Sequence, residues 1–203
     1  SLVKVTYTHN QRALELSHGE LHIDVAHDKD RPLSVYAAGK VMQAVGTAFN
    51  VQLLQQQLKL TVTDGTVLVA EQDPENVDLS HSKDVRLPAS SLKLNKGEFS
   101  TLSSPEPLVS ILPKEDIDAV LSWQVGKLIF RGETLQQAMS QVSRYTGVKF
   151  EFANEQLAKV KIAGSFKTND LPALLAALKN NFSIVHERIG ENVVILKTEG
   201  IKA

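Results

Sequence analysis

The feature that most constrains the fold is an apolar pattern that occurs twice in the C-terminal third of the chain. Each copy begins with a phenylalanine, Phe130 or Phe166, and continues with apolar residues at the i, i+3, i+4 and i+7 spacing of one buried helix face. The helical positions are Leu135, Ala138, Met139 and Val142 in the first copy and Leu171, Leu174, Leu175 and Leu178 in the second. A strand-like segment follows each copy, at residues 148–152 and 183–188. The pattern predicts a duplicated β-α-β unit whose apolar helix positions are buried.

Local signals mark the ends of both predicted helices. Thr134 and Gln137 have the spacing of a capping box, and Gly147 is placed to end the first helix. Asp170 and Pro172 suit the first turn of the second helix. Both helices are therefore expected to begin and end within a residue or two of these positions.

The first hundred residues carry a different repeat, with the period-2 alternation of β-strands. Three segments share a strand–Gly–strand pattern around Gly19, Gly65 and Gly97. Glycine supplies the positive φ of a tight turn, and Asp64-Gly65 is the strongest turn signal of the three. Residues 1–102 are therefore expected to form an all-β stack of hairpins with one apolar face.

Two prolines, Pro105 and Pro107, interrupt the strand pattern, because proline lacks the donor hydrogen and restricts the residue before it. They predict a domain boundary. We expect an all-β subdomain at residues 1–107, a linker with a short helix at 108–122, and the β-α-β repeat subdomain at 123–203. The expected fold class is α+β.

The composition excludes several functions. Among 203 residues, 22 are basic and 23 are acidic, so no net field attracts nucleic acid, and no nucleic-acid partner is expected. The absence of cysteine excludes disulfides, thiolate catalysis and Cys-ligated zinc. No run approaches the roughly 18 apolar residues of a membrane helix, and no leader pattern opens the sequence. The chain is expected to be either cytosolic or a trimmed piece of a longer protein, and the strand-like start at residues 2–7 favours the trimmed piece.

Several segments resemble, in their order and spacing, the periplasmic part of FecR-like sigma-factor regulators. The segments are residues 19–26, 31–35 and 45–51, the Trp-x2-Gly-x-Leu-x-Phe signature within 122–130, and Arg144-Tyr145. The resemblance extends from about residue 5 to about residue 197. The C-terminal repeat resembles the short N-terminal domain shared by secretins and TonB-dependent signalling transporters.

The resemblance implies the periplasmic region of a single-pass inner-membrane anti-sigma regulator. Such a region binds the N-terminal signalling domain of a TonB-dependent outer-membrane transporter and relays ferric-chelate uptake to an extracytoplasmic-function sigma factor. The sigma factor would be bound only through a cytoplasmic segment that is missing here. Periplasmic and intramembrane proteases would act on the full-length protein.

The resemblance also makes Gly46-Thr47 a candidate self-cleavage site, because some members of the family cut themselves at the matching dipeptide. The threonine hydroxyl attacks the preceding carbonyl, the amide shifts to an ester, and water opens the ester. Glycine lets the peptide bend, and the intramolecular hydroxyl has a high effective molarity. The alternative is that Gly46 relieves a crowded strand and Thr47 is an ordinary β-branched strand residue. No other enzymatic activity is expected.

A cluster of polar residues near the start of the chain raises the question of a metal site. Glu20, His22 and Asp24 share one side of a predicted strand, and His18 and His27 lie nearby. The competing interpretation is that the apolar residues between them form the buried face, so these polar residues occupy the solvent face. No fourth ligand or supporting partner can be named, so no metal and no cofactor are expected.

The partner is expected to dock on an open sheet edge of the C-terminal subdomain, which ends in a predicted strand at residues 193–197. An extended strand of the partner would add to this edge by main-chain hydrogen bonds. The candidate partner-binding residues are Val185, Glu187, Val193 and Ile195.

Two alternative functions remain open. The chain could be the signalling or plug extension of a TonB-dependent transporter or secretin, although such an extension does not need the long β region before the repeat. It could also be an all-β ligand-binding or enzyme domain. That reading requires a pocket lined by aromatic residues, which make up only 5% of the chain.

Overall fold

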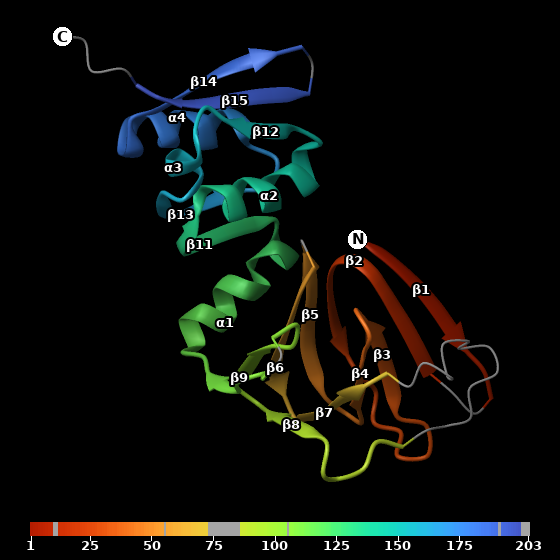
Figure 1. Cartoon of the computed structure of the whole chain (residues 1–203). Helices are drawn as coiled ribbons and strands as arrows, with labels where there is room; N and C mark the ends of the chain where they lie inside the picture. Colours follow the sequence, from red (N-terminus) through yellow and green to blue (C-terminus); the bar gives the residue numbers. More distant parts are fainter. Residues whose placement is uncertain (10–11, 55, 73–85, 105, 191, 200–203) are drawn as a thin grey trace. The chain divides into compact units, whose positions relative to one another are not determined.

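The computed structural model describes residues 1–9, 12–54, 56–72, 86–104, 106–190 and 192–199. The chain forms two compact units, Ser1–Ile117 and Asp118–Ala203, which are coloured from red to green and from green to blue in Figure 1. The division falls inside the segment expected to be a linker, whereas Pro105 of the predicted boundary lies outside the described residues. Within the described part of the chain, every helix is too short or too polar to cross a lipid bilayer.

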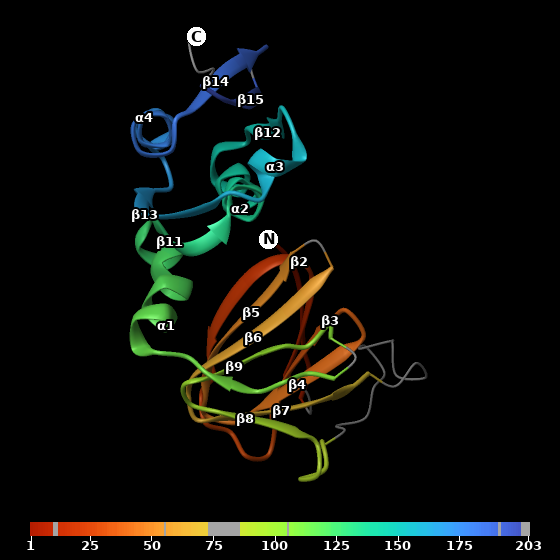
Figure 2. The ribbon, with the colours of Figure 1, turned by 60° about the vertical axis from the view of Figure 1, so that its left-hand side comes forward.

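In the N-terminal unit, two sheets share one strand. The described strands are β1 (Leu2–Tyr7), β2 (Arg12–Asp24), β3 (Leu33–Ala37), β4 (Lys40–Ala44), β5 (Ala48–Leu54), β6 (Gln57–Asp64), β7 (Thr66–Glu71), β8 (Leu92–Asn95), β9 (Glu98–Thr101) and β10 (Ser110–Ile111). Sheet 1 has the order β1-β2-β3-β4-β7-β8, and sheet 2 has the order β2-β5-β6-β9-β10. Strand β2 belongs to both sheets (Figure 2).

The prediction of a hairpin at Gly19 is wrong, because β2 runs through this residue without turning back. Before Gly19, β2 pairs with β1 and β3, and from Gly19 onward it pairs with β5. Gly19 has a φ of +105°, and a Cβ on it would lie 2.6 Å from the Cα of Ser1. The glycine therefore lets the chain change sheets where the start of β1 comes close.

The hairpins predicted at Gly65 and Gly97 are wrong for a related reason. Both glycines have the expected positive φ, +76° and +83°. However, β6 pairs with β5 and β9, while β7 pairs with β4 and β8. At each glycine the chain thus crosses from one sheet to the other. True hairpins, such as β3–β4 in sheet 1 and β5–β6 in sheet 2, lie between the crossings.

A continuous apolar core fills the N-terminal unit. Both sheets contribute buried side chains, and the largest fully buried ones are Leu16, Met42, Phe49, Leu58, Leu60, Leu94 and Leu102. The all-β segment was expected to have one apolar face, whereas apolar residues of two sheets meet in this core.

The C-terminal unit follows the strand–helix–strand order predicted for the duplicated segment. Its elements are β11 (Lys127–Thr134), α2 (Leu135–Thr146), β12 (Lys149–Phe152), α3 (Glu155–Ala158), β13 (Lys161–Lys167), α4 (Leu171–Phe182), β14 (Ile184–Ile189) and β15 (Val193–Thr198). Helix α1 (Lys114–Leu121) and a 3₁₀ helix at Ser122–Val125 precede them. The α+β class is therefore confirmed.

The strands on either side of each repeated helix do not pair with one another. Strand β11 pairs with β13 in an antiparallel ribbon, and the three-stranded sheet has the order β12-β15-β14. Helices α2 and α4 lie between the ribbon and the three-stranded sheet in both views (Figures 1 and 2). The duplication therefore describes the order of elements, while the sheets are assembled from strands of different copies.

The helix-end signals are confirmed. The Thr134 hydroxyl accepts a hydrogen bond from the Gln137 amide at 3.2 Å, and the Gln137 side chain accepts one from the Thr134 amide at 3.0 Å. Gly147 ends α2 in the left-handed conformation, and Asp170 caps the Ala173 amide at 3.0 Å.

The apolar helix positions of the repeat are buried, except that Leu171 is only partly buried against the same core.

Leu178 is fully buried, so its truncation leaves a cavity that the surrounding helices and strands cannot fill. We expect Leu178→Ala to lower the free energy of unfolding by about 2–5 kcal/mol. Chemical denaturation followed by circular dichroism measures the change. The matched control is Leu108→Ala, because Leu108 is 80% exposed and its truncation leaves no cavity. Equal stability of the two variants would show that the helix face is not a core.

Candidate functional site

Gly46 and Thr47 lie in the bend that connects β4 of sheet 1 to β5 of sheet 2. This bend is another crossing between the sheets. Neither residue is in a strand, so Thr47 is not the strand residue of the alternative interpretation, although Gly46 does occupy a crowded position. Gly46 has a φ of +61°, a left-handed conformation that glycine adopts at little cost.

Two other crossings meet the chain at this bend. The Val25 amide, just after β2, donates a 2.8 Å hydrogen bond to the Thr47 carbonyl. On another side, a Cβ on Gly65 would lie 2.7 Å from the Thr47 methyl carbon and 3.3 Å from the Gly46 carbonyl oxygen. The bend is therefore held between two neighbouring segments, and Gly65 permits one of these close approaches.

The Thr47 side chain is enclosed but its hydroxyl is not used. Thr47 is only 4% exposed, and its Oγ1 has no hydrogen-bond partner among the described residues. A buried hydroxyl without a partner costs free energy, so such groups are uncommon. The Thr47 hydroxyl, the group that an N-to-O acyl shift would use, is therefore buried and unengaged among the described residues.

The His27 imidazole covers Gly46. A Cβ on Gly46 would lie 2.5 Å from His27 Nδ1 and 3.2 Å from His27 Cβ and Cγ. Any larger residue at position 46 would displace the imidazole. In the sequence, His27 stands out only as a candidate metal ligand, and no local motif links it to a residue 19 positions later in the chain.

Hydrogen bonds fix the loop that carries His27, between β2 and β3. Arg12 donates to the carbonyls of Ala26 at 3.1 Å and Arg31 at 2.7 Å. Asp28 accepts from the Asp30 and Arg31 amides, both at 3.1 Å, and pairs with the Arg31 guanidinium. The pKa of Asp28 is lowered: desolvation acts to raise it, and the hydrogen bonds and charge of Arg31, with the Asp30 amide, outweigh that effect.

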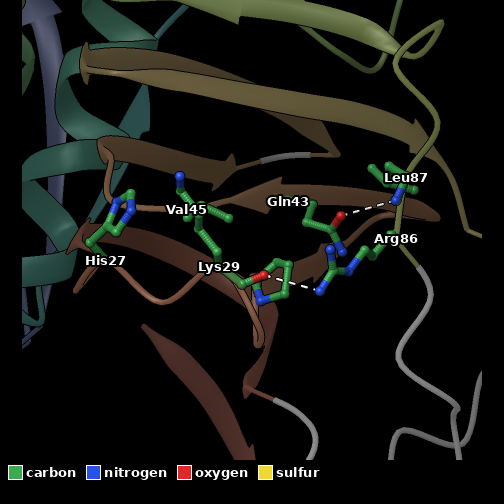
Figure 3. Close-up of a pocket in the computed structure, with 7 residues that line it drawn as sticks. His27, Lys29, Gln43, Val45, Arg86 and Leu87 are labelled. Atoms are coloured by element: carbon green, nitrogen blue, oxygen red, sulfur yellow. Dashed lines mark hydrogen bonds between the residues drawn. The ribbon is translucent and has the colours of Figure 1, made fainter.

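An open pocket adjoins this loop, with a volume of about 480 Å³. It is lined by His27, Lys29, Pro32, Gln43, Val45, Arg86 and Leu87. Figure 3 shows the Arg86 guanidinium donating to the Lys29 carbonyl, at 3.1 Å, and the Leu87 amide donating to Gln43, at 2.9 Å. The described lining includes basic side chains and no acidic one, and it reaches Val45, the residue before Gly46.

The polar residues considered as metal ligands are not gathered into a site. Glu20 is 8% exposed and accepts a 3.0 Å hydrogen bond from Asn50, whereas Asp24 is exposed. Their side of β2 is therefore not simply the solvent face, and Leu21 and Ile23 are only partly buried. Across the described residues, no group of three or more His, Asp or Glu side chains is placed to hold a metal ion.

The expected docking edge is partly misplaced. Val193 and Ile195 lie on β15, which is the central strand of its sheet because β12 and β14 flank it. Val185 and Glu187 lie on β14, which pairs only with β15 and therefore forms an edge. The hydrogen bond and charge of Lys197 lower the pKa of the Glu187 carboxyl, so this ion pair links the edge strand to its neighbour.

The register of β14 shows which backbone groups lie on its free edge. The Glu199 amide donates to the Ser183 carbonyl at 2.8 Å, so the hydrogen-bonded pairs alternate from Ser183 through Val185 and Glu187. The amides of His186 and Arg188 therefore point away from β15. Both residues have exposed side chains, so these donors are accessible to a partner strand.

The other two signature segments, at Trp123 and at Arg144-Tyr145, make contacts within the C-terminal unit. Trp123 is partly buried against the C-terminal core. The Arg144 guanidinium lies 5.8 Å from the centroid of the Tyr145 ring, a cation–π contact within the signature itself.

Comparisons with known proteins agree with the two units. The family model described as FecR protein matches residues 1–68, and the model described as FecR, C-terminal matches residues 127–196. Two crystal structures of a candidate anti-sigma factor from Parabacteroides distasonis ATCC 8503, at 1.65 and 2.50 Å, share the fold, with TM-scores of 0.75 and 0.73. Each is 19% identical, and the aligned regions cover 98% and 96% of this chain and 86% and 84% of the neighbour. No curated protein matches the chain.

His22, on β2, gives a pH dependence that can be measured. Burial lowers its pKa below the ordinary 6.5, and the nearby Asp24 carboxylate offsets this only in part. The unfolded chain therefore takes up the proton first as the pH falls, so the stability due to neutral His22 is complete above pH 6.5 and is lost as the pH drops through the lowered folded pKa. We expect the thermal midpoint to fall less in His22→Gln than in the wild type between about pH 7.5 and about pH 5. If the thermal midpoints of the wild type and His22→Gln fall by the same amount over this pH range, His22 does not have this role.

Proposed function

The chain belongs to the FecR family of anti-sigma regulators, and from this premise we propose that it is the signal-receiving region of such a regulator in the periplasm. Its C-terminal unit would bind the signalling domain of a TonB-dependent outer-membrane transporter and so relay uptake of a ferric chelate. The sigma factor would be bound by a cytoplasmic segment of the same regulator. The family models that match both units support this proposal.

The observation that carries the docking proposal is the free edge of β14. Its outward amides, at His186 and Arg188, are accessible, and an extended strand can pair with such a row of donors and acceptors. Two of the competing edges, those of β12 and β11, are less suitable. Strand β12 has only four residues, and β11 carries a bulge between Arg131 and Glu133, a device that discourages edge pairing.

His186→Pro tests this edge directly. Proline removes the outward amide of residue 186 but none of the hydrogen bonds between β14 and β15, so the fold is expected to survive. We expect binding of a purified transporter signalling domain, measured by calorimetry, to weaken at least about tenfold, the effect of losing roughly 1.4 kcal/mol.

The matched control is His186→Ala, which keeps the backbone donor and is expected to bind like the wild type. Circular dichroism and the thermal midpoint establish that both variants are folded. The comparison uses the transporter signalling domain that binds the wild type. If folded His186→Pro binds this domain with the wild-type affinity, the partner does not dock on the edge of β14.

A second function, self-processing at Gly46-Thr47, is favoured by the unengaged Thr47 hydroxyl in its buried bend. In the proposed reaction Oγ1 of Thr47 bonds to the Gly46 carbonyl carbon, and the bond from that carbon to the Thr47 nitrogen breaks. The hydroxyl proton passes to the nitrogen, which leaves an ester and a free amine. Water then hydrolyses the ester, so that Gly46 ends in a carboxylate and the Thr47 hydroxyl is restored.

Such a cut would not separate the two pieces. Strand β5 follows the cut but pairs with β2, which precedes it, and β4 before the cut pairs with β7 after it. Both pieces also contribute to one apolar core. The processed chain is therefore expected to remain a single folded unit held by noncovalent contacts.

Substitutions of Thr47 separate the chemical role from the structural one. Thr47→Ala and Thr47→Val are expected to abolish the cut, because they lack the oxygen, whereas Thr47→Ser keeps it. Valine preserves the branched shape, so Thr47→Val should also keep the wild-type thermal midpoint. Intact mass of the full-length regulator detects two pieces whose masses add up to the chain plus one water. A wild-type regulator that stays whole through long incubation would refute self-processing.

A further inference from the structure

We propose that His27 is the proton-transfer group of the acyl shift at Gly46-Thr47. This inference rests on the proposed self-processing and adds to it a residue that no motif indicates. The imidazole would take the proton from the Thr47 hydroxyl and deliver it to the Thr47 nitrogen.

The placement of the imidazole carries the inference. His27 Nδ1 lies 2.5 Å from the point where a Cβ of Gly46 would stand. That point is one covalent bond from the Gly46 Cα, so Nδ1 lies no more than about 4 Å from the Cα. The carbonyl carbon that the hydroxyl would attack is the next atom of the chain. Gly46 thus has two structural reasons to be glycine, its positive φ and the imidazole against it.

The chain around His27 is held rather than free. The preceding Val25 amide is bonded to the Thr47 carbonyl itself, and the Ala26 carbonyl is bonded to Arg12. The following Asp28 is paired with Arg31. These contacts join the histidine loop directly to the bend that would be cut, which is the preorganisation that proton transfer needs.

The acyl shift needs one proton to leave oxygen and one to reach nitrogen, and imidazole exchanges protons near neutral pH. Neutral Nδ1 would accept the Oγ1 proton as the oxygen–carbon bond forms. The resulting imidazolium would return it to the Thr47 nitrogen as the carbon–nitrogen bond breaks, so the histidine ends unchanged.

In the proposed second step, water would approach from the pocket. His27 and Val45 line it together, so solvent reaches the imidazole beside the residue that precedes Gly46 (Figure 3). Lys29 and Arg86 are the charged groups that share the pocket with His27, and Asp28 beside it is already paired with Arg31. Their positive charge suits the carboxylate that hydrolysis leaves at Gly46.

The test measures the rate of cutting in the full-length regulator by intact mass after refolding from denaturant. We expect His27→Ala to slow the cut by about a hundredfold or more, the usual effect of losing a general acid or base. Free imidazole added to His27→Ala should restore part of the rate, because the substitution leaves space beside Gly46. The dependence of the cutting rate on pH should differ between the wild type and His27→Ala, because the variant lacks the proton-transfer group.

The matched control is His18→Ala, an exposed histidine on β2, which should cut at the wild-type rate. The thermal midpoint establishes that each variant is folded. If the wild type cuts and folded His27→Ala cuts equally fast, His27 has no part in the reaction although self-processing stands. If His27→Ala is slow but imidazole does not help and the pH profile is unchanged, the residue is only structural. A wild-type chain that never cuts overturns both proposals.

Discussion

The hydrogen bond from the Val25 amide to the Thr47 carbonyl joins two of the places where the chain changes sheets, and the architecture of the N-terminal unit depends on such joined crossings. Gly65 packs on the same bend, and the Lys96 amide in turn donates to the Gly65 carbonyl at 2.9 Å. These contacts therefore link the crossings at Val25, Thr47, Gly65 and Lys96 to one another. Each crossing sends the next pair of strands to the opposite sheet. Successive strand pairs therefore alternate between the two sheets, and the two sheets enclose a single core.

Signals that act within one turn of helix could be read from the sequence. The capping box of Thr134, the left-handed Gly147 and the Asp170 cap each involve residues three or four positions apart, so the local sequence contains both partners. The apolar helix face of the repeat was equally readable, because burial follows from a 3.6-residue period. These are the features on which sequence and structure agree.

Pairing between distant strands could not be read in the same way. Asp64-Gly65 predicts a reversal with positive φ, which is present, but a hairpin and a crossing both satisfy that signal. The choice is made by β9 and β4, which pair with β6 and β7 from elsewhere in the sequence. The last strand is central rather than peripheral for the same reason, since β12 pairs with it in parallel. At the candidate site, Gly46-Thr47 was found by resemblance, whereas the contact of His27 with Gly46 exists only in the folded chain.

Strand β2 has a mechanical consequence. Its first half is bonded to β1 and β3 and its second half to β5, so it is the one described strand that is a member of both sheets. Displacing β2 would break ladder bonds in each sheet, so neither sheet can lose this strand while the other stays intact.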